Sequence, residues 1–175
     1  MAVVIVLIVL VVALLISGFL RPSTFHIERS TVVSTPPERI APFINDFHQW
    51  TGWSPWEKMD PTMKKTFGGA TAGVGAVYEW AGNSKVGQGR MEITASQPER
   101  IVIKLDFIKP FEGHNVATFA IVSEPIGAKV KWAMDGHVNY MMRVMGLFMN
   151  MDKMIGKDFE AGLSNLKGLA EDSVR

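Results

Sequence analysis

The stretch MMRVMGLFMNMDKMIGKDFEAGLSNLKGLAE, residues 141–171, decides the fold of this chain. Apolar side chains recur along it at the spacing of one helix face, while charged and polar side chains fall on the opposite face. The pattern predicts one long amphipathic helix, and its apolar stripe needs a large apolar partner. The stripe consists of Met141, Val144, Phe148, Met151, Ile155, Phe159, Gly162, Leu166 and Leu169.

The first half of this helix is unusually rich in methionine. Met142, Met145 and Met149 widen the apolar face beyond the stripe. Flexible thioethers suit a surface that must fit varied shapes. We therefore expect residues 141–149 to meet a ligand, a partner chain or a membrane, and the half from Met151 onward to pack into a core.

The N-terminal run AVVIVLIVLVVALLISGFL, residues 2–20, contains no charged side chain. Nineteen helical residues span about 28 Å, which is close to the thickness of a bilayer core. The run predicts a transmembrane anchor over residues 1–21, followed by one domain over residues 22–175. A cleaved signal peptide is the alternative, but no Lys or Arg precedes the run and no small-x-small cleavage site follows it.

Charge and composition exclude several classes of function. The net charge of +1 gives no electrostatic reason to expect a nucleic-acid partner. Cysteine is absent, which excludes disulfides, thiol catalysis and cysteine-ligated metals. Arg21, Arg29 and Arg39 follow the apolar run, so the positive-inside rule favours a cytoplasmic domain.

Between the two helices the sequence is typical of an antiparallel sheet. Residues 25–33 alternate as a first strand, a short helix is expected over about 37–47, and residues 48–61 form an irregular segment with three of the five tryptophans. Short alternating runs separated by glycine-bearing turns then predict six successive strands and an α+β fold. These runs are MKKTFGG, GAVYEWAG, VGQGRMEITA, RIVIKLDFI, HNVATFAIVSE and AKVKWAMDG.

Three stretches carry a resemblance to a known family: TPPERIAPFINDFHQWTGWSPWEKMDPTMKKTFGG, GNSKVGQGRMEI and MGLFMNMDKMIGKDFEAGLSNLK. The chain resembles the SRPBCC superfamily, and more narrowly the bacterial polyketide cyclase/dehydrase-like branch of the START and birch-pollen-allergen helix-grip fold. The resemblance implies a seven-stranded curved antiparallel sheet around the long C-terminal helix, with a cavity between them. It places WTGWSPWEK beside the cavity mouth and the methionine-rich half of the helix in a wall. An N-terminal membrane helix is common in this branch, which implies a single-pass protein of the bacterial inner membrane.

Aromatic and methionine side chains are the candidate ligand contacts. The tryptophans and Tyr78 together have more aromatic surface than a small core must bury. An apolar pocket with indole N–H groups suits a lipid-like or aromatic molecule. A membrane-anchored protein that binds such a hydrophobic small molecule is therefore the leading hypothesis. The predicted contacts are Trp53, Trp56, Tyr78, Trp80, Phe107, Trp132, Met145, Phe148 and Met149.

Two further hypotheses remain from other classes of function. Asp46, His48 and Glu57 are close enough in sequence to act as acid and base in a cyclase- or dehydratase-type enzyme, a lyase or isomerase. The third hypothesis is an accessory or assembly subunit of a membrane protein complex. Ser54 lacks the glycine-flanked elbow of a hydrolase nucleophile, and the scattered histidines predict neither a metal site nor any cofactor.

Overall fold

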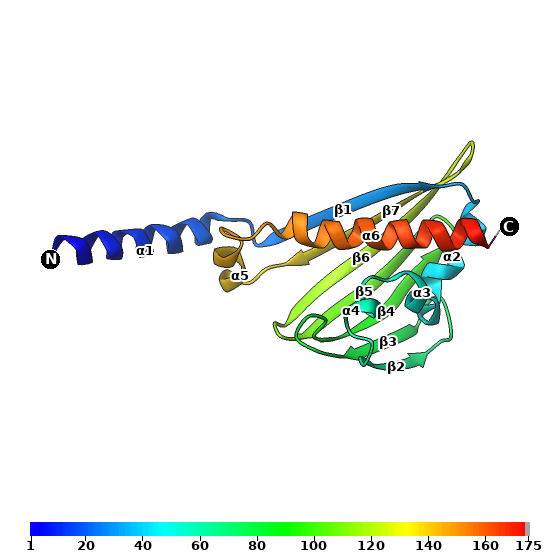
Figure 1. The fold of residues 1–175 in the computed structure, drawn as a ribbon, viewed down its shortest axis with the longest axis horizontal. Helices are drawn as coiled ribbons and strands as arrows, with labels where there is room; N and C mark the ends of the chain where they lie inside the picture. Colours follow the sequence, from blue (N-terminus) through cyan, green and yellow to red (C-terminus); the bar gives the residue numbers. More distant parts are fainter. Residues whose placement is uncertain (174–175) are drawn as a thin grey trace.

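The computed structural model describes residues 1–173, in which a seven-stranded sheet is flanked by a long C-terminal helix and an apolar N-terminal helix (Figure 1). The N-terminal helix, α1 (Ala2–Leu20), projects from the rest of the molecule as a rod whose C-terminal end contacts the segment after β7 (Gly127–His137). Gly18 is its one buried residue. Its length and composition are sufficient to cross a membrane.

The sheet has the strand order β1-β7-β6-β5-β4-β3-β2, and every neighbouring pair is antiparallel. The seven strands follow one another as a meander, except that β1 closes the sheet beside β7. This arrangement confirms the predicted α+β helix-grip architecture. The strands are β1 (Thr24–Val33), β2 (Lys64–Gly69), β3 (Ala76–Ala81), β4 (Gln88–Gln97), β5 (Arg100–Lys109), β6 (Gly113–Glu124) and β7 (Gly127–His137).

One face of the sheet carries the core because side chains alternate along each strand. In β5, Ile101, Ile103 and Leu105 are buried, and in β7 the same holds for Val130 and Trp132. These are the faces that the period-two pattern predicts. The helices and the cavity lie against this inner face.

Four short helical segments connect β1 to β2: α2 (Pro37–Asn45), η1 (Phe47–Gln49), α3 (Trp50–Trp53) and α4 (Trp56–Met59). The segment predicted to be irregular is therefore mostly helical, in turns separated by Ser54 and Pro55. Two of its tryptophans are buried and held by hydrogen bonds. The indole N–H of Trp50 donates to the Ile44 carbonyl at 3.0 Å, and that of Trp53 donates to the Phe43 carbonyl at 2.9 Å.

The prediction of a single helix over residues 141–171 is wrong. The structure has a short helix, α5 (Tyr140–Met145), and a separate long helix, α6 (Met151–Asp172). Gly146 ends the first helix, and Asn150 begins the second by accepting a hydrogen bond from the Lys153 backbone N–H at 2.9 Å. This N-cap satisfies a free donor of the first turn and stabilises the break.

Arg29 fixes α6 against β1, the strand along which the helix runs (Figure 1). Its guanidinium donates to the Glu160 carboxylate at 2.8 Å and to the Asp152 carboxylate at 3.0 and 3.1 Å. A Cβ at Gly156 would overlap this guanidinium, so the glycine makes room for the ion pairs. Arg29 therefore holds the N-terminal half of α6, while Lys167, which donates to the Val32 carbonyl at 2.7 Å, holds its C-terminal half.

Candidate functional site: an apolar cavity between sheet and helix

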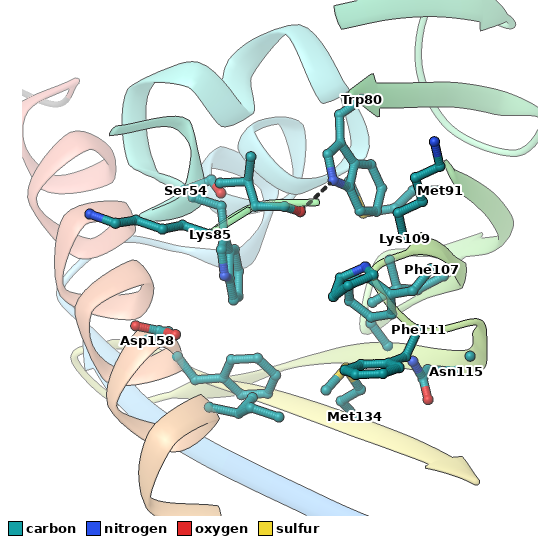
Figure 2. Close-up of a pocket in the computed structure, with 18 of the residues that line it drawn as sticks. Ser54, Trp80, Lys85, Met91, Phe107, Lys109, Phe111, Asn115, Met134 and Asp158 are labelled. Atoms are coloured by element: carbon teal, nitrogen blue, oxygen red, sulfur yellow. Dashed lines mark hydrogen bonds between the residues drawn. The ribbon is translucent and has the colours of Figure 1, made fainter. Parts of the chain in front are cut away.

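A cavity of about 330 Å³ lies between the inner face of the sheet and α6 (Figure 2). Strands β3 to β7, helices α4 and α6, and the turn between β5 and β6 all contribute to its wall. Most of the lining is aromatic or aliphatic, which is the composition of a site for an apolar small molecule. The principal apolar lining residues are Phe25, Trp56, Met63, Tyr78, Trp80, Met91, Leu105, Phe107, Phe111, Trp132, Met134, Ile155 and Phe159.

Two tryptophans of the wall are held in fixed orientations. The Trp80 indole N–H donates to the Val86 carbonyl at 3.0 Å, a bond drawn in Figure 2. The Trp132 ring stacks on Phe159 of α6 with 4.2 Å between centroids and 5° between planes. Such rigid rings give the cavity a defined shape before any ligand arrives. The Trp132 indole N–H has no hydrogen-bond partner within residues 1–173.

A buried polar cluster interrupts the apolar wall at Glu57. The Tyr78 hydroxyl donates to one carboxylate oxygen at 2.6 Å, and the Lys65 ammonium donates to the other at 2.6 Å. Only 6% of the Glu57 side chain is exposed, so both partners are needed to offset its desolvation. Burial, followed by the hydrogen bond to Glu57, raises the pKa of Tyr78 far above its usual range. The phenol therefore stays protonated and acts as a donor.

A second polar region lies at the cavity edge. Figure 2 shows Lys85 and Asp158 on one side, across the cavity from Phe107 and Phe111. Burial raises the pKa of the Asp158 carboxyl, an effect that the nearby Lys157 opposes. The cavity thus combines an apolar interior with one buried polar cluster and a partly charged rim.

Five of the nine predicted ligand contacts line this cavity: Trp56, Tyr78, Trp80, Phe107 and Trp132. Trp53 is fully buried behind the wall, where its ring contacts Trp132 with 5.5 Å between centroids. The structure places Met145, Phe148 and Met149 outside the cavity: Met145 lies on α5, and the other two lie in the connection from α5 to α6.

The three predicted acid/base residues are not brought together around the cavity. Glu57 lines it, whereas Asp46 and His48 form a separate pair beside β2. The His48 ring nitrogen Nδ1 lies 2.7 Å from Asp46 Oδ1, and the ring stacks on Phe67 at 4.0 Å. Partial burial raises the pKa of Asp46, but hydrogen bonds from the His48 backbone N–H and ring outweigh it and leave that pKa below its usual range.

Two of the other histidines each lie near two carboxylates, with Glu28 3.7 Å from His26 and Glu112 3.6 Å from His114. His26 lies 2.7 Å from Asp135, and His114 lies 2.7 Å from Asp106, on different strand pairs. His137 is the one histidine in the cavity lining. Within the described residues, no three His, Asp or Glu side chains gather as metal ligands.

Sequence reasoning missed several lining residues. Phe111 lies in the turn between β5 and β6, and no periodic pattern reports which way a turn residue points. Asp158 is more informative, since on the helix wheel it lies beside Ile155 at the edge of the apolar stripe. A carboxylate next to an apolar stripe is a detectable signal for a polar contact in a helix-lined site.

A family model described as "Polyketide cyclase / dehydrase and lipid transport" matches residues 24–171. No curated protein matches this sequence.

Among solved structures, protein CV1439 from Chromobacterium violaceum superposes with a TM-score of 0.60 at 19% identity, covering 86% of this chain and 99% of that one. Protein MLL2253 from Mesorhizobium loti gives 0.56 at 21% identity, covering 85% and 97%. The di-domain ARO/CYC StfQ of the steffimycin biosynthetic pathway gives 0.63 at 9% identity, covering 86% of this chain and 52% of StfQ. At these identities the likeness is one of fold.

Proposed function

Because this chain belongs to the polyketide cyclase/dehydrase and lipid transport family, we propose that it binds a small apolar molecule, lipid-like or aromatic, between the sheet and α6. In this proposal residues 1–21 anchor the protein in a membrane and the remainder forms the binding domain. The observation that carries the proposal is the cavity itself, about 330 Å³ of space with an aromatic and methionine wall. That volume lies within the range of roughly 300 to 1,000 Å³ found for small-molecule sites.

The polar cluster suggests the chemistry of the ligand. A carboxylate ligand group placed near Glu57 would gain little there, because the one ammonium group of the cluster, that of Lys65, is already paired with Glu57. A hydroxyl or carbonyl group would instead find polar partners at little desolvation cost. We therefore favour a predominantly apolar ligand with an uncharged polar group.

The short connection between α1 and β1 supports a membrane source for the ligand. Only residues 21–23 separate α1 from β1, so the binding domain would lie against the bilayer surface. An apolar molecule could then pass between lipid and cavity without crossing bulk water, which is the step that its low solubility makes slow.

Substitution of Ala117 tests the site. Ala117 lines the cavity from β6, whereas Ala120 on the same strand points to the opposite face. Ala117→Phe should place a ring in the cavity and abolish binding of a neutral fluorescent hydrophobe such as N-phenyl-1-naphthylamine. Ala120→Phe is the matched control and should leave binding intact.

The assay uses the full chain in detergent, with probe fluorescence and intrinsic tryptophan fluorescence as readouts. Mass spectrometry of an organic extract of the purified protein provides an independent measurement of bound lipid. Equal probe binding by both variants, together with no extractable hydrophobe, would refute the proposed site.

A cyclase- or dehydratase-type enzyme is the second candidate, and the Glu57–Tyr78 contact favours it. The Glu57 carboxylate lines an apolar cavity, where it is placed to accept a proton from a bound ligand, and the Tyr78 hydroxyl is a hydrogen-bond donor 2.6 Å away. The test is incubation with poly-β-ketone substrates and detection of water loss by mass spectrometry. Turnover that survives Glu57→Gln would exclude this acid/base role.

A further inference from the structure

The short helix α5 packs closely against the C-terminal end of α1. The Tyr140 hydroxyl donates to the Leu15 carbonyl at 2.8 Å. A Cβ at Gly18 would overlap the Val144 side chain, so the two helices approach as closely as a glycine permits. Arg21 in turn donates to the Gly146 carbonyl at 2.6 Å, beyond the end of α5. Figure 1 shows α5 at the junction between the rod and the sheet.

These contacts fix the depth of α5 relative to α1. Leu15 precedes the last residue of α1, Leu20, by five positions, which is about 7.5 Å along a helix axis. Amphipathic segments that lie in a membrane surface bury their apolar face by roughly 5 to 10 Å. If α1 crosses the bilayer, α5 is therefore held at the boundary between head groups and acyl chains.

The surface of this segment has the matching composition. Met141, Met145, Phe148 and Met149 are all exposed, and Phe148 has 74% of its surface accessible. The Arg143 guanidinium lies 5.5 Å from the centre of the Tyr140 ring and donates to the Phe19 carbonyl at 3.3 Å. Exposed apolar side chains next to tyrosine and arginine are typical of a membrane interface and unfavourable in water.

We infer that residues 140–149 lie in the bilayer interface beside α1, and that lipid covers Met141, Met145, Phe148 and Met149. This inference rests on the anchoring part of the proposed function and adds a second membrane-contacting element. It assigns these methionines to lipid, although sequence reasoning placed two of them in the ligand site.

The inference also locates the end of the cavity that faces the membrane. A groove on the outer surface is lined by Arg21, Val138 and Phe148 among others. Phe25, Met142 and Met151 line both this groove and the cavity. These three side chains are the partition between the ligand site and the surface that meets lipid.

Single cysteines test the inference, since the chain has none of its own. Met145→Cys and Phe148→Cys place a polarity-sensitive nitrobenzoxadiazole label on the segment. Val9→Cys reports on α1, and Ile126→Cys in the β6–β7 turn is the exposed control at the far end of β7. Each full-length variant is reconstituted into phosphatidylcholine and phosphatidylglycerol vesicles and quenched either with brominated lipids or with aqueous iodide.

The labels at 145 and 148 should lose most of their fluorescence to brominated lipid and little to iodide, and the label at 126 should do the reverse. Iodide quenching at 145 and 148 while the label at 9 is quenched by lipid would overturn the inference and leave the anchor intact. Lipid quenching at 145 and 148 but not at 9 would refute a spanning α1, and with it the depth of α5 on which the inference rests. Iodide quenching at all four positions would overturn both.

Discussion

Glu57 places a carboxylate within a mostly apolar wall, and its two short hydrogen bonds explain how the fold tolerates it. Tyr78→Phe would remove the phenol donor and leave one carboxylate oxygen without its partner. We expect a loss of about 1 to 3 kcal/mol in the free energy of unfolding, the usual cost of a buried polar group left unsatisfied. Urea denaturation of the single variants and of the double variant with Glu57→Gln measures the coupling. A Tyr78→Phe protein of unchanged stability would show that water replaces the phenol.

Asp158 should make the protein less stable as pH rises, whereas a carboxylate paired with a cation makes a protein less stable as pH falls. Because burial raises its pKa in the folded protein, ionisation is less favourable there than in the unfolded chain. Its favourable contribution is present below the ordinary pKa of 3.8 and is lost as pH rises through the raised value. Asp158→Asn should therefore gain stability relative to the unmodified protein between acidic and neutral pH.

The control for Asp158 is Asp152 on the same helix. The hydrogen bonds from Arg29 lower the pKa of Asp152, so its contribution is present at neutral pH and is lost as pH falls. Asp152→Asn should lose stability at neutral pH and converge with the unmodified protein in acid. Thermal melts at several pH values follow both differences, and parallel curves for the two variants would contradict the assignment.

Two neighbouring tryptophans show what the sequence could not predict about the site. Trp53 and Trp56 are three positions apart and both were expected at the ligand, yet one is enclosed by the core and the other lines the cavity. The difference arises because α3 ends at Trp53 and a new turn begins after Pro55. The sequence indicates that such rings are buried. It does not indicate which way each ring points, because that depends on turns that leave no periodic pattern.

At the scale of elements, α6 lies close to the sheet because Gly156 and Gly162 face it. A Cβ at Gly162 would lie 2.8 Å from the Trp132 ring, whereas nothing lies within 4 Å of a Cβ at Gly168. Gly162→Ala should destabilise the protein by about 1 to 3 kcal/mol, because overpacking exceeds the gain in helix propensity. Gly168→Ala, on the exposed side, should stabilise it by about 0.5 to 1 kcal/mol. Urea denaturation compares them, and equal effects would argue against close packing on Trp132.

The strands were predictable and the helix break was not, for a physical reason. Each strand buries one face, so alternation records both its existence and its orientation. Across residues 146–150 the apolar stripe continues in phase, and methionine, leucine and phenylalanine are all compatible with a helix. The break depends on Asn150 as N-cap, but Lys153 follows where a capping box would have Glu or Gln. The break was therefore not predicted, because the Asn150 N-cap that stabilises it lacks the Glu or Gln that usually marks a cap in the sequence.

At the scale of the whole molecule, sheet, helix and N-terminal rod are arranged along one direction (Figure 1). The α1 end of the sheet is where Thr24 pairs with His137 and where α5 packs, and the cavity reaches this end through Met142 and Met151. The sequence predicted the transmembrane anchor and the helix-grip domain as separate parts. Their connection through α5 comes from long-range contacts such as Tyr140 to Leu15, which no local pattern encodes.

This arrangement predicts that Met142 controls the rate of ligand exchange more than the affinity. Met142→Ala would thin the partition between groove and cavity, and a barrier lowered by about 1.4 kcal/mol would speed transfer from vesicles roughly tenfold in both directions. Met91→Ala is the matched control, because Met91 lines the cavity but not the groove and should change affinity instead. Stopped-flow transfer of a fluorescent hydrophobe from vesicles to the reconstituted protein gives the rates, and equilibrium titration gives the affinities. Unaltered rates for Met142→Ala, or the same acceleration for Met91→Ala, would show that ligands reach the cavity by another path.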